Sequence, residues 1–247
     1  MVAFYLYTSL WLLSSPGSVE LPVVVLDAGH GGMQIGALGV CGLKEKDVTL
    51  HITTEVAHLL EASSQVKTHL TRKDDSEVEL RERPRIADSL NADLFISIHA
   101  NASRRPVHRG VETFFLSARG SKSKLSELAL RENEGVNTHH SNHSELEFIL
   151  SGLQHNASHA ESQKLAVELQ ESLVEDLNVK ARGVLQERFL VLQHATMAAA
   201  LVEVGFLTNP RECKLLKRID YRRKVARSIA RAILSHLRHR RSLLAQR

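Results

Sequence analysis

Three short apolar runs constrain the fold of this chain more than any other feature. They cover residues 23–26, 94–98 and 199–204, and apart from Glu203 they are apolar enough for strands covered on both faces. Between them, apolar residues follow helical spacing, as at Val48 and Ile52. Alternating strands and helices predict an α/β fold: a single domain with a mostly parallel central sheet and helices on both faces.

The remaining elements are predicted from shorter patterns. The sequence Ser76-Glu-Val-Glu79 has the spacing of a capping box, which favours a helix start there, although Pro84 interrupts the pattern. Further strands are expected at 65–70, 110–116 and 189–192, and further helices at 159–177, 210–216 and 221–237. Together these elements place one domain over residues 21–237.

Three segments do not fit this alternation. Residues 1–20 contain an apolar run that resembles the core of a secretory signal, although the usual Lys/Arg-bearing start is absent. A segment packed on the domain and a misassigned start codon are the alternatives, and we favour export. Residues 117–158 are rich in Ser, Asn, His and Glu and are interpreted as an insertion. Residues 238–247 are expected to form a solvated basic tail.

Composition narrows the class of partner only modestly. The 247-residue chain has a formal net charge of +4, which suits an anionic polymer, and only 4% aromatic residues. Single-strand nucleic-acid binders stack bases on aromatic side chains, so no nucleic-acid partner is expected. Cys41 and Cys213 form no C-x-x-C motif, and the sequence leaves open whether they pair or stay free.

Two histidines lie at the ends of apolar runs. His30, in Asp27-Ala-Gly-His-Gly-Gly, is flanked by glycines, so core packing explains it poorly. His99 closes a second buried strand, where a lone histidine is more often structural, but its parallel with His30 favours a pair of metal ligands. Because the carboxyl ends of strands in such sheets meet at one crevice, we expect the two imidazoles to converge.

Two glutamates complete the pattern. Glu45 precedes a predicted helix and, taken alone, is compatible with a solvated helix start. Glu203 lies inside an apolar run, where a buried carboxylate is costly unless it is paired or bound to a metal. Burial also raises the pKa of a carboxylate, which suits a general base. Two imidazoles and a carboxylate with one open position are typical of a hydrolytic zinc site.

These motifs resemble, in the same order, those of the zinc-dependent N-acetylmuramoyl-L-alanine amidases, over residues 22–237. The family's first histidine motif matches residues 27–32, its ligand glutamate matches Glu45, and its second histidine matches His99 in Ser-Ile-His-Ala-Asn. The catalytic glutamate of the family matches Glu203 in Leu-Val-Glu-Val-Gly-Phe. Each motif alone is a weak signal, whereas four in order are specific.

The resemblance implies a zinc ion held by His30, Glu45 and His99, with water in the fourth position. It implies hydrolysis of the amide between N-acetylmuramic acid and the L-alanine of the peptidoglycan stem peptide. Glu203 would take the proton of the water and return it to the leaving amine. The resemblance also implies an exported enzyme of the periplasm or cell envelope, which we expect to be a monomer.

Residues 117–158 fall where the division amidases of this family carry a helical insertion that blocks the zinc until an activator protein displaces it. Residues 126–134 have the composition of a short helix, in which Glu132 best matches the blocking glutamate, with Glu127 and Glu134 as rivals. A flexible polar loop is the alternative. The histidines of this region are expected to be solvated rather than to bind a second metal: 139, 140, 143, 155 and 159.

Arg72 and Asn101 are candidates for substrate binding, although a structural ion pair is the favoured role of Arg72. Two other functions stay open at this point. One is a zinc peptidase or deacetylase acting on the cell wall, although the usual His-Glu-x-x-His motif is absent. The other is a non-catalytic wall-binding or scaffolding domain, which would leave the cost of burying Glu203 unexplained.

Overall fold

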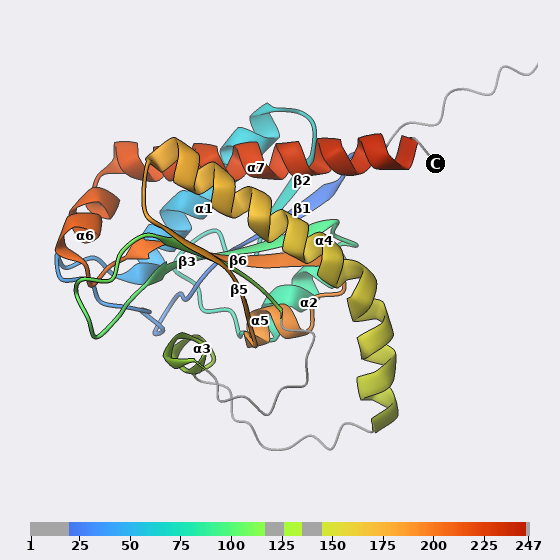
Figure 1. Cartoon of the computed structure of the whole chain (residues 1–247), viewed down its shortest axis with the longest axis horizontal. Coiled ribbons are helices and arrows are strands. Elements are labelled where there is room, and N and C mark those ends of the chain that lie inside the picture. Colours follow the sequence, from blue (N-terminus) through green and yellow to red (C-terminus); the bar gives the residue numbers. More distant parts are fainter. Residues whose placement is uncertain (1–19, 117–125, 135–144, 246–247) are drawn as a thin grey trace, which may run out of the picture.

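A six-stranded β-sheet lies at the centre of the molecule, and helices cover both of its faces (Figure 1). The computed structural model describes residues 20–116, 126–134 and 145–245. Its strands are β1 (Val23–Ala28), β2 (Lys67–Leu70), β3 (Leu94–Asn101), β4 (Val111–Leu116), β5 (Ala181–Glu187) and β6 (Ala198–Phe206). Its helices are α1 (Glu45–Ala62), α2 (Glu82–Ser89), α3 (Glu127–Glu132), α4 (Glu145–Leu177), α5 (Leu190–Gln193), α6 (Pro210–Lys217) and α7 (Ile219–Ala245).

The strands follow the order β2-β1-β3-β6-β4-β5. Within the described residues, neighbouring strands are parallel except for the pair of β4 and β6. The predicted α/β fold with a mostly parallel sheet is therefore confirmed. The chain leaves β1 toward one edge of the sheet and β3 toward the other, so the carboxyl ends of these two strands flank a topological switch point. Open α/β sheets bind their ligands at such points.

Two hydrophobic cores join the helices to the sheet. On one face, α1, α4 and α7 pack together over the strands, with Ile52, Leu169 and Ile229 fully buried. On the other face, a smaller core joins α2, α5 and part of α3 (Figure 1). Within β1, Val24 belongs to the first core and Val25 to the second. This burial on both faces explains why the strand is continuously apolar.

The predicted strand at 189–192 is wrong, because these residues lie in and just before α5. Four apolar residues are too few for periodicity to separate a strand from a helical turn. The strand of this region is β5, which pairs with β4 at the edge of the sheet. It is only partly buried and contains Arg182 and Gly183, so it offers no apolar run in the sequence.

The helix expected at Ser76 begins later, at Glu82. The amide of Ser76 donates to Asp74 Oδ1 at 2.9 Å, so Ser76 lies in a turn before the helix. Pro84 then falls in the first turn of α2, where its missing amide hydrogen costs no helical hydrogen bond. The proline thus marks a helix start rather than an interruption.

Two boundaries of the flanking segments also differ from the prediction. Helix α4 begins at Glu145, so the last part of the 117–158 segment is helical rather than a loop. Helix α7 continues to Ala245, so residues 238–245 are its final turns rather than a tail. Arg240 in these turns pairs with Asp93 at 3.0 Å, which ties them to the start of β3.

A disulfide joins Cys41 to Cys213, the pairing that the sequence left open. It links the loop between β1 and α1 to α6, across 172 residues. In the chain-entropy view, closing a loop of this length stabilises the folded state by about 5 kcal/mol. Disulfides persist in oxidising compartments, so this bond agrees with export.

Some predictions fall on segments beyond those described above. The signal-like segment lies outside them except for Glu20, as do the histidines at 139, 140 and 143. His159, expected to be solvated, is half-buried, and its ring lies 5.1 Å from that of Phe115. Among the helices that the structure describes, none combines the length and the apolar character that crossing a membrane requires.

Candidate metal centre

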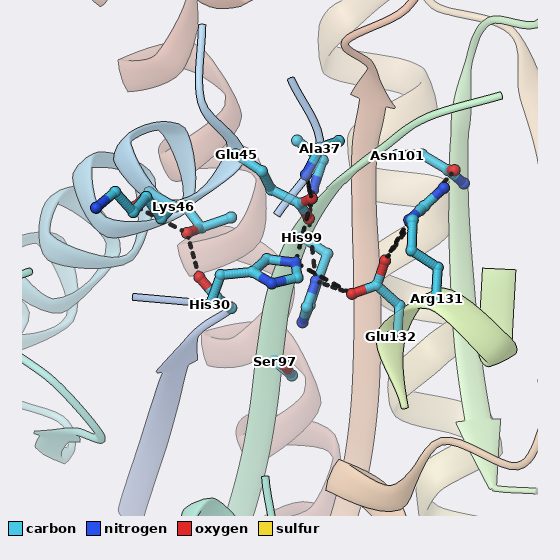
Figure 2. A network of polar contacts seen from close by, with 12 residues as sticks. His30, Ala37, Glu45, Lys46, Ser97, His99, Asn101, Arg131 and Glu132 are labelled. Carbon is cyan, nitrogen blue, oxygen red and sulfur yellow. Dashed lines mark hydrogen bonds and ion pairs between the residues drawn. The ribbon is translucent and has the colours of Figure 1, made fainter. Parts of the chain in front are cut away.

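Four side chains from four separate segments converge beside the switch point (Figure 2). They are His30 after β1, Glu45 at the start of α1, His99 in β3 and Glu132 at the end of α3. His30 Nε2 lies 3.1 Å from Glu45 Oε2, and His99 Nδ1 lies 3.1 Å from Glu45 Oε1. Glu132 Oε2 lies 3.1 Å from His30 Nε2 and 3.0 Å from His99 Nδ1. The structure therefore brings the three predicted ligands together, and adds the glutamate from the insertion.

The four side chains are suited to a zinc ion, since one ligand atom from each lies within 4.8 Å of the other three. Bonds of about 2.0–2.1 Å place the ligand atoms of such an ion about 3.3 Å apart. The nitrogen–oxygen distances of 3.0–3.1 Å are close to that value. Within the described residues, His30 Nε2 and Glu132 Oε2 are buried without a hydrogen-bond partner, and a shared cation would satisfy both. Imidazole and carboxylate groups are the donors that hydrolytic zinc sites use.

Glycine lets the ligands approach so closely. A Cβ atom at Gly29 would lie 2.5 Å from the His99 ring, and one at Gly36 would lie 2.6 Å from both Glu45 Oε2 and His30 Cδ2. Real Cβ contacts are longer, so any other residue at these positions would push the ligands apart. His30 itself has a φ of 61°, in the left-handed region that non-glycine residues rarely adopt.

Glu45 is oriented by the backbone on either side of it. Its Oε2 accepts a hydrogen bond from the Ala37 amide at 2.8 Å, and its Oε1 accepts one from the Ala100 amide at 3.0 Å (Figure 2). Burial opposes the ionised carboxylate, but the charge and hydrogen bonds of His30 and His99 lower the pKa of Glu45 to about 2. Glu45 is thus a fixed anion, as a metal ligand must be.

Arg72 supports the His30 loop rather than facing a substrate. Its Nε donates to Ala28 O, and its Nη2 donates to Gly29 O and Lys46 O, each at 2.9 Å. The residue is only 3% exposed. These contacts support the structural role that the sequence analysis favoured for Arg72.

Arg72→Ala should lower both stability and metal affinity, because three backbone carbonyls around the candidate ligands would each lose one hydrogen bond. Losing groups that orient a metal ligand typically costs about 10–100-fold in metal affinity. Competition with a zinc chelator and a thermal melt measure the two effects. A variant with normal zinc affinity and melting temperature, but a raised KM, would restore the substrate-binding role.

A buried ion pair between Asp27 and Arg83 lies beneath the centre. Asp27 Oδ1 accepts from Thr71 Oγ1 at 2.6 Å and from Arg83 Nη1 at 2.8 Å, and Asp27 Oδ2 accepts from Ser97 Oγ at 2.6 Å. Arg83 also donates to His30 O at 3.0 Å. Burial opposes the charge of Asp27, but Arg83 and the hydroxyls hold its pKa below the ordinary value. The sequence signal was an aspartate at the end of a buried strand.

Glu203 lies beside the centre but is not among its four converging donors. In the sheet register it is opposite His99 on β3 and opposite Glu112 on β4. It is fully buried, and neither of its oxygens has a hydrogen-bond partner within the described part of the chain. Burial, followed by the charges of Glu132 and Glu45, raises the pKa of Glu203 well above its ordinary value. A carboxyl group in this environment can accept and return a proton.

Glu132 is an ionised side chain among the histidines. Burial opposes its charge, but His99 and His30 hold the pKa of Glu132 well below the ordinary value. Its other oxygen, Oε1, pairs with Arg131 Nη2 at 2.9 Å. One glutamate therefore joins both imidazoles to an arginine of its own helix.

Arg131 fastens α3 to the end of β3. Its Nη1 donates to Ala102 O at 2.9 Å, and its Nη2 donates to Asn101 Oδ1 at 3.3 Å (Figure 2). Asn101 is buried and donates through Nδ2 to Glu112 Oε2 at 3.1 Å, and Glu112 in turn pairs with Arg182. The predicted substrate-binding residue Asn101 is thus covered by the insertion.

The other side of α3 is fastened to the segment before α5. Asn133 Nδ2 donates to Arg188 O at 3.0 Å, and Asn133 Oδ1 accepts from the Leu190 amide at 2.9 Å. Ser126 caps the helix by accepting from the Ala129 amide at 3.0 Å, and Ala129 is fully buried. The expected short helix therefore exists, and contacts on both sides hold Glu132 at the metal centre.

Comparison with known proteins points in one direction. A family model described as N-acetylmuramoyl-L-alanine amidase matches residues 24–235. The amidase AmiA of Escherichia coli (strain K12) is 33% identical over 219 residues, which cover 87% of this chain and 75% of AmiA. The structure of amidase AmiC2 of Nostoc punctiforme is 32% identical, with a TM-score of 0.68, over 88% of this chain and 97% of that chain. The amidase CwlD from Clostridioides difficile, solved in complex with the GerS lipoprotein, is 29% identical, with a TM-score of 0.66, over 87% of this chain and 98% of that chain.

Proposed function

The chain belongs to the N-acetylmuramoyl-L-alanine amidase family, and we propose that it cleaves the amide between N-acetylmuramic acid and L-alanine with a zinc ion held by His30, Glu45 and His99. One observation carries this proposal. The side-chain nitrogens of His30 and His99 each lie 3.1 Å from a carboxylate oxygen of Glu45, next to the buried Glu203 on the adjacent strand. The match over residues 24–235 and the amidase relatives support the reaction.

Each ligand has a defined part in the proposed centre. Two imidazole nitrogens and one carboxylate oxygen leave one position of a tetrahedral set for water or the scissile carbonyl. Bound zinc would polarise that carbonyl and lower the pKa of the water. The amides of Ala37 and Ala100 would keep the Glu45 carboxylate turned toward the histidines.

Glu203 is the proposed general base and acid. It would take a proton from the attacking water and deliver it to the α-amino group of the departing L-alanine. Its burial, its lack of a hydrogen-bond partner in the described residues and its register opposite His99 support this role. Proton transfer by a positioned carboxyl group contributes about 10²–10⁴-fold to such reactions.

In the resting state, α3 would close the site. Glu132 Oε2 lies 3.1 Å from His30 Nε2 and 3.0 Å from His99 Nδ1, and there it would compete with water for a bound zinc ion. This inhibition is direct competition by one carboxylate and needs no coupling to a remote site. Displacing α3 would also free the Asn101 amide oxygen, which could then accept a hydrogen bond from the substrate.

A second protein is the proposed means of displacement. The contacts of Arg131 and Asn133 must break together before Glu132 can leave the centre. The complex of the related amidase CwlD with the GerS lipoprotein supports partner binding within this fold. The Cys41–Cys213 disulfide and the peptidoglycan substrate support a location in the periplasm or cell envelope.

Zinc removal provides the test of this proposal. Elemental analysis should find one zinc ion per chain in the wild type and much less zinc in His99→Ala. The control is His58→Ala, which removes an exposed histidine of α1 and should leave the zinc content unchanged. A chelator should abolish hydrolysis of a soluble muropeptide, and one equivalent of zinc should restore it. Hydrolysis by protein shown to be free of metal would contradict the proposal.

A further inference from the structure

Helix α7 carries the positive charge of this protein. It holds eight of the 32 Lys and Arg residues but only one of the 28 Asp and Glu residues. The rest of the chain is therefore net negative, and an anionic polymer would be attracted to α7 rather than to the molecule as a whole. The helix lies on the face of the sheet opposite α3 (Figure 1).

Part of this charge lines a groove. A cavity of about 550 Å³ lies among α1, α4 and α7, and Lys224, Arg227, Arg231 and Arg238 all line it. These residues are spaced 3, 4 and 7 positions apart, so they form one stripe along the helix. At 1.5 Å per residue the stripe is about 21 Å long. None of the residues that line the groove belongs to the metal centre.

Three of the four cations are available to a ligand. Arg231 pairs with Glu175 and Asp176 of α4. Lys224, Arg227 and Arg238 are exposed, and no acidic partner lies within 4.0 Å of them among the described residues. Like charges held along one face of a helix repel one another. A bound anion would therefore relieve the electrostatic repulsion among the cations of α7.

The lining also contains apolar groups. Leu59, Ala230 and Leu234 lie in the groove between the cations. A ligand that fits must combine carboxylate or other anionic groups with short apolar side chains along an extended chain. Peptidoglycan stem peptides have this composition, because they combine alanine methyl groups with free carboxylates along one short chain. A flat membrane surface fits less well, because the exposed apolar residues of α7, Ile219 and Leu243, do not line the groove.

We infer that this groove is a second binding site for stem peptides, which anchors the enzyme on the wall at a distance from the metal centre. The inference rests on the proposed substrate, but not on zinc or on the closure by α3. Anchoring of this kind would keep the enzyme on the polymer between cleavage events. It would depend on salt, because exposed charges are screened at high ionic strength.

Sedimentation with purified sacculi tests the inference. The triple variant Lys224→Glu, Arg227→Glu and Arg238→Glu should bind sacculi about tenfold more weakly than the wild type, since each exposed ion pair contributes modestly. The control is a second triple variant, Lys180→Glu, Lys214→Glu and Lys73→Glu. It changes the net charge by the same amount at exposed residues outside the groove, and it should bind sacculi within about twofold of the wild type. Both variants should melt like the wild type.

Two other binding measurements decide the identity of the ligand. Glycan strands stripped of their stem peptides should bind much more weakly than intact sacculi, and phosphatidylglycerol vesicles should bind more weakly still. Equal binding by the groove variant and the wild type, equal binding of stripped glycan, or preferred binding of vesicles would each overturn the inference. Hydrolysis of a soluble muropeptide tests the proposed amidase activity independently of wall binding. The groove variant should hydrolyse this muropeptide like the wild type.

Discussion

Glu203→Ala should bind zinc normally and lose hydrolysis, with a fall in turnover on the order of 10²–10⁴-fold. The reason lies in the separation of roles at the site. The four converging donors do not include Glu203, so its loss leaves the metal ligands intact. It does remove the buried carboxyl opposite His99, whose pKa is raised well above the ordinary value by burial and by the charges of Glu132 and Glu45.

Glu203→Gln is the matched variant, because it keeps the shape of the side chain and removes only the ability to exchange a proton. Both variants should be compared by elemental analysis, thermal melting and hydrolysis of a soluble muropeptide. Loss of zinc from both would make Glu203 a ligand or an essential support for one. Full activity in either variant would contradict its assignment as the base.

Glu132→Ala should raise the basal activity by about tenfold or more. Glu132 Oε2 forms ion pairs with both imidazoles at 3.0–3.1 Å, and polar contacts to charged groups are worth about 1.5–3 kcal/mol each. Removing one such contact shifts the balance between closed and open sites by about a factor of ten. The assay is hydrolysis of peptidoglycan in the absence of any activator.

The controls for this variant lie on the same segment. Glu127→Ala and Glu134→Ala alter exposed glutamates and should leave the basal activity near that of the wild type. Deletion of the insertion should also activate the enzyme, provided that it ends at residue 144, because α4 begins at Glu145. If Glu132→Ala stays at or below wild-type activity while folded and zinc-loaded, closure by α3 is excluded.

The order and type of most elements could be predicted because the sheet is buried on both faces. Continuous apolar runs such as Val23–Leu26 leave few alternatives to a central strand. The edge strand β5 gave no such signal, since an edge is half-solvated and tolerates Arg182 and Gly183. Helix starts depended on single residues, and Pro84 was more informative than the capping-box spacing at Ser76.

At the site, the candidate ligands could be recognised from local motifs, whereas the hydrogen bonds and ion pairs that hold them in place could not. His30, Glu45 and His99 each lie in a short pattern that is visible in the sequence. The partners of Asp27 are instead 44, 56 and 70 residues away, on segments that only the folded sheet brings together. The contacts of Arg131 with the end of β3 are likewise a product of tertiary structure.

A zinc-dependent amidase that cuts next to N-acetylmuramic acid releases characteristic ends, so identifying these ends is the decisive experiment. Purified sacculi should be digested with the zinc-loaded chain, opened by Glu132→Ala, and the products identified by mass spectrometry. The expected products are intact stem peptides with free L-alanine amino termini. Cuts inside the peptides or lost acetyl groups would point to a zinc peptidase or deacetylase. Binding without any release would indicate a scaffolding domain, and each of these results would rule out the proposed amidase reaction.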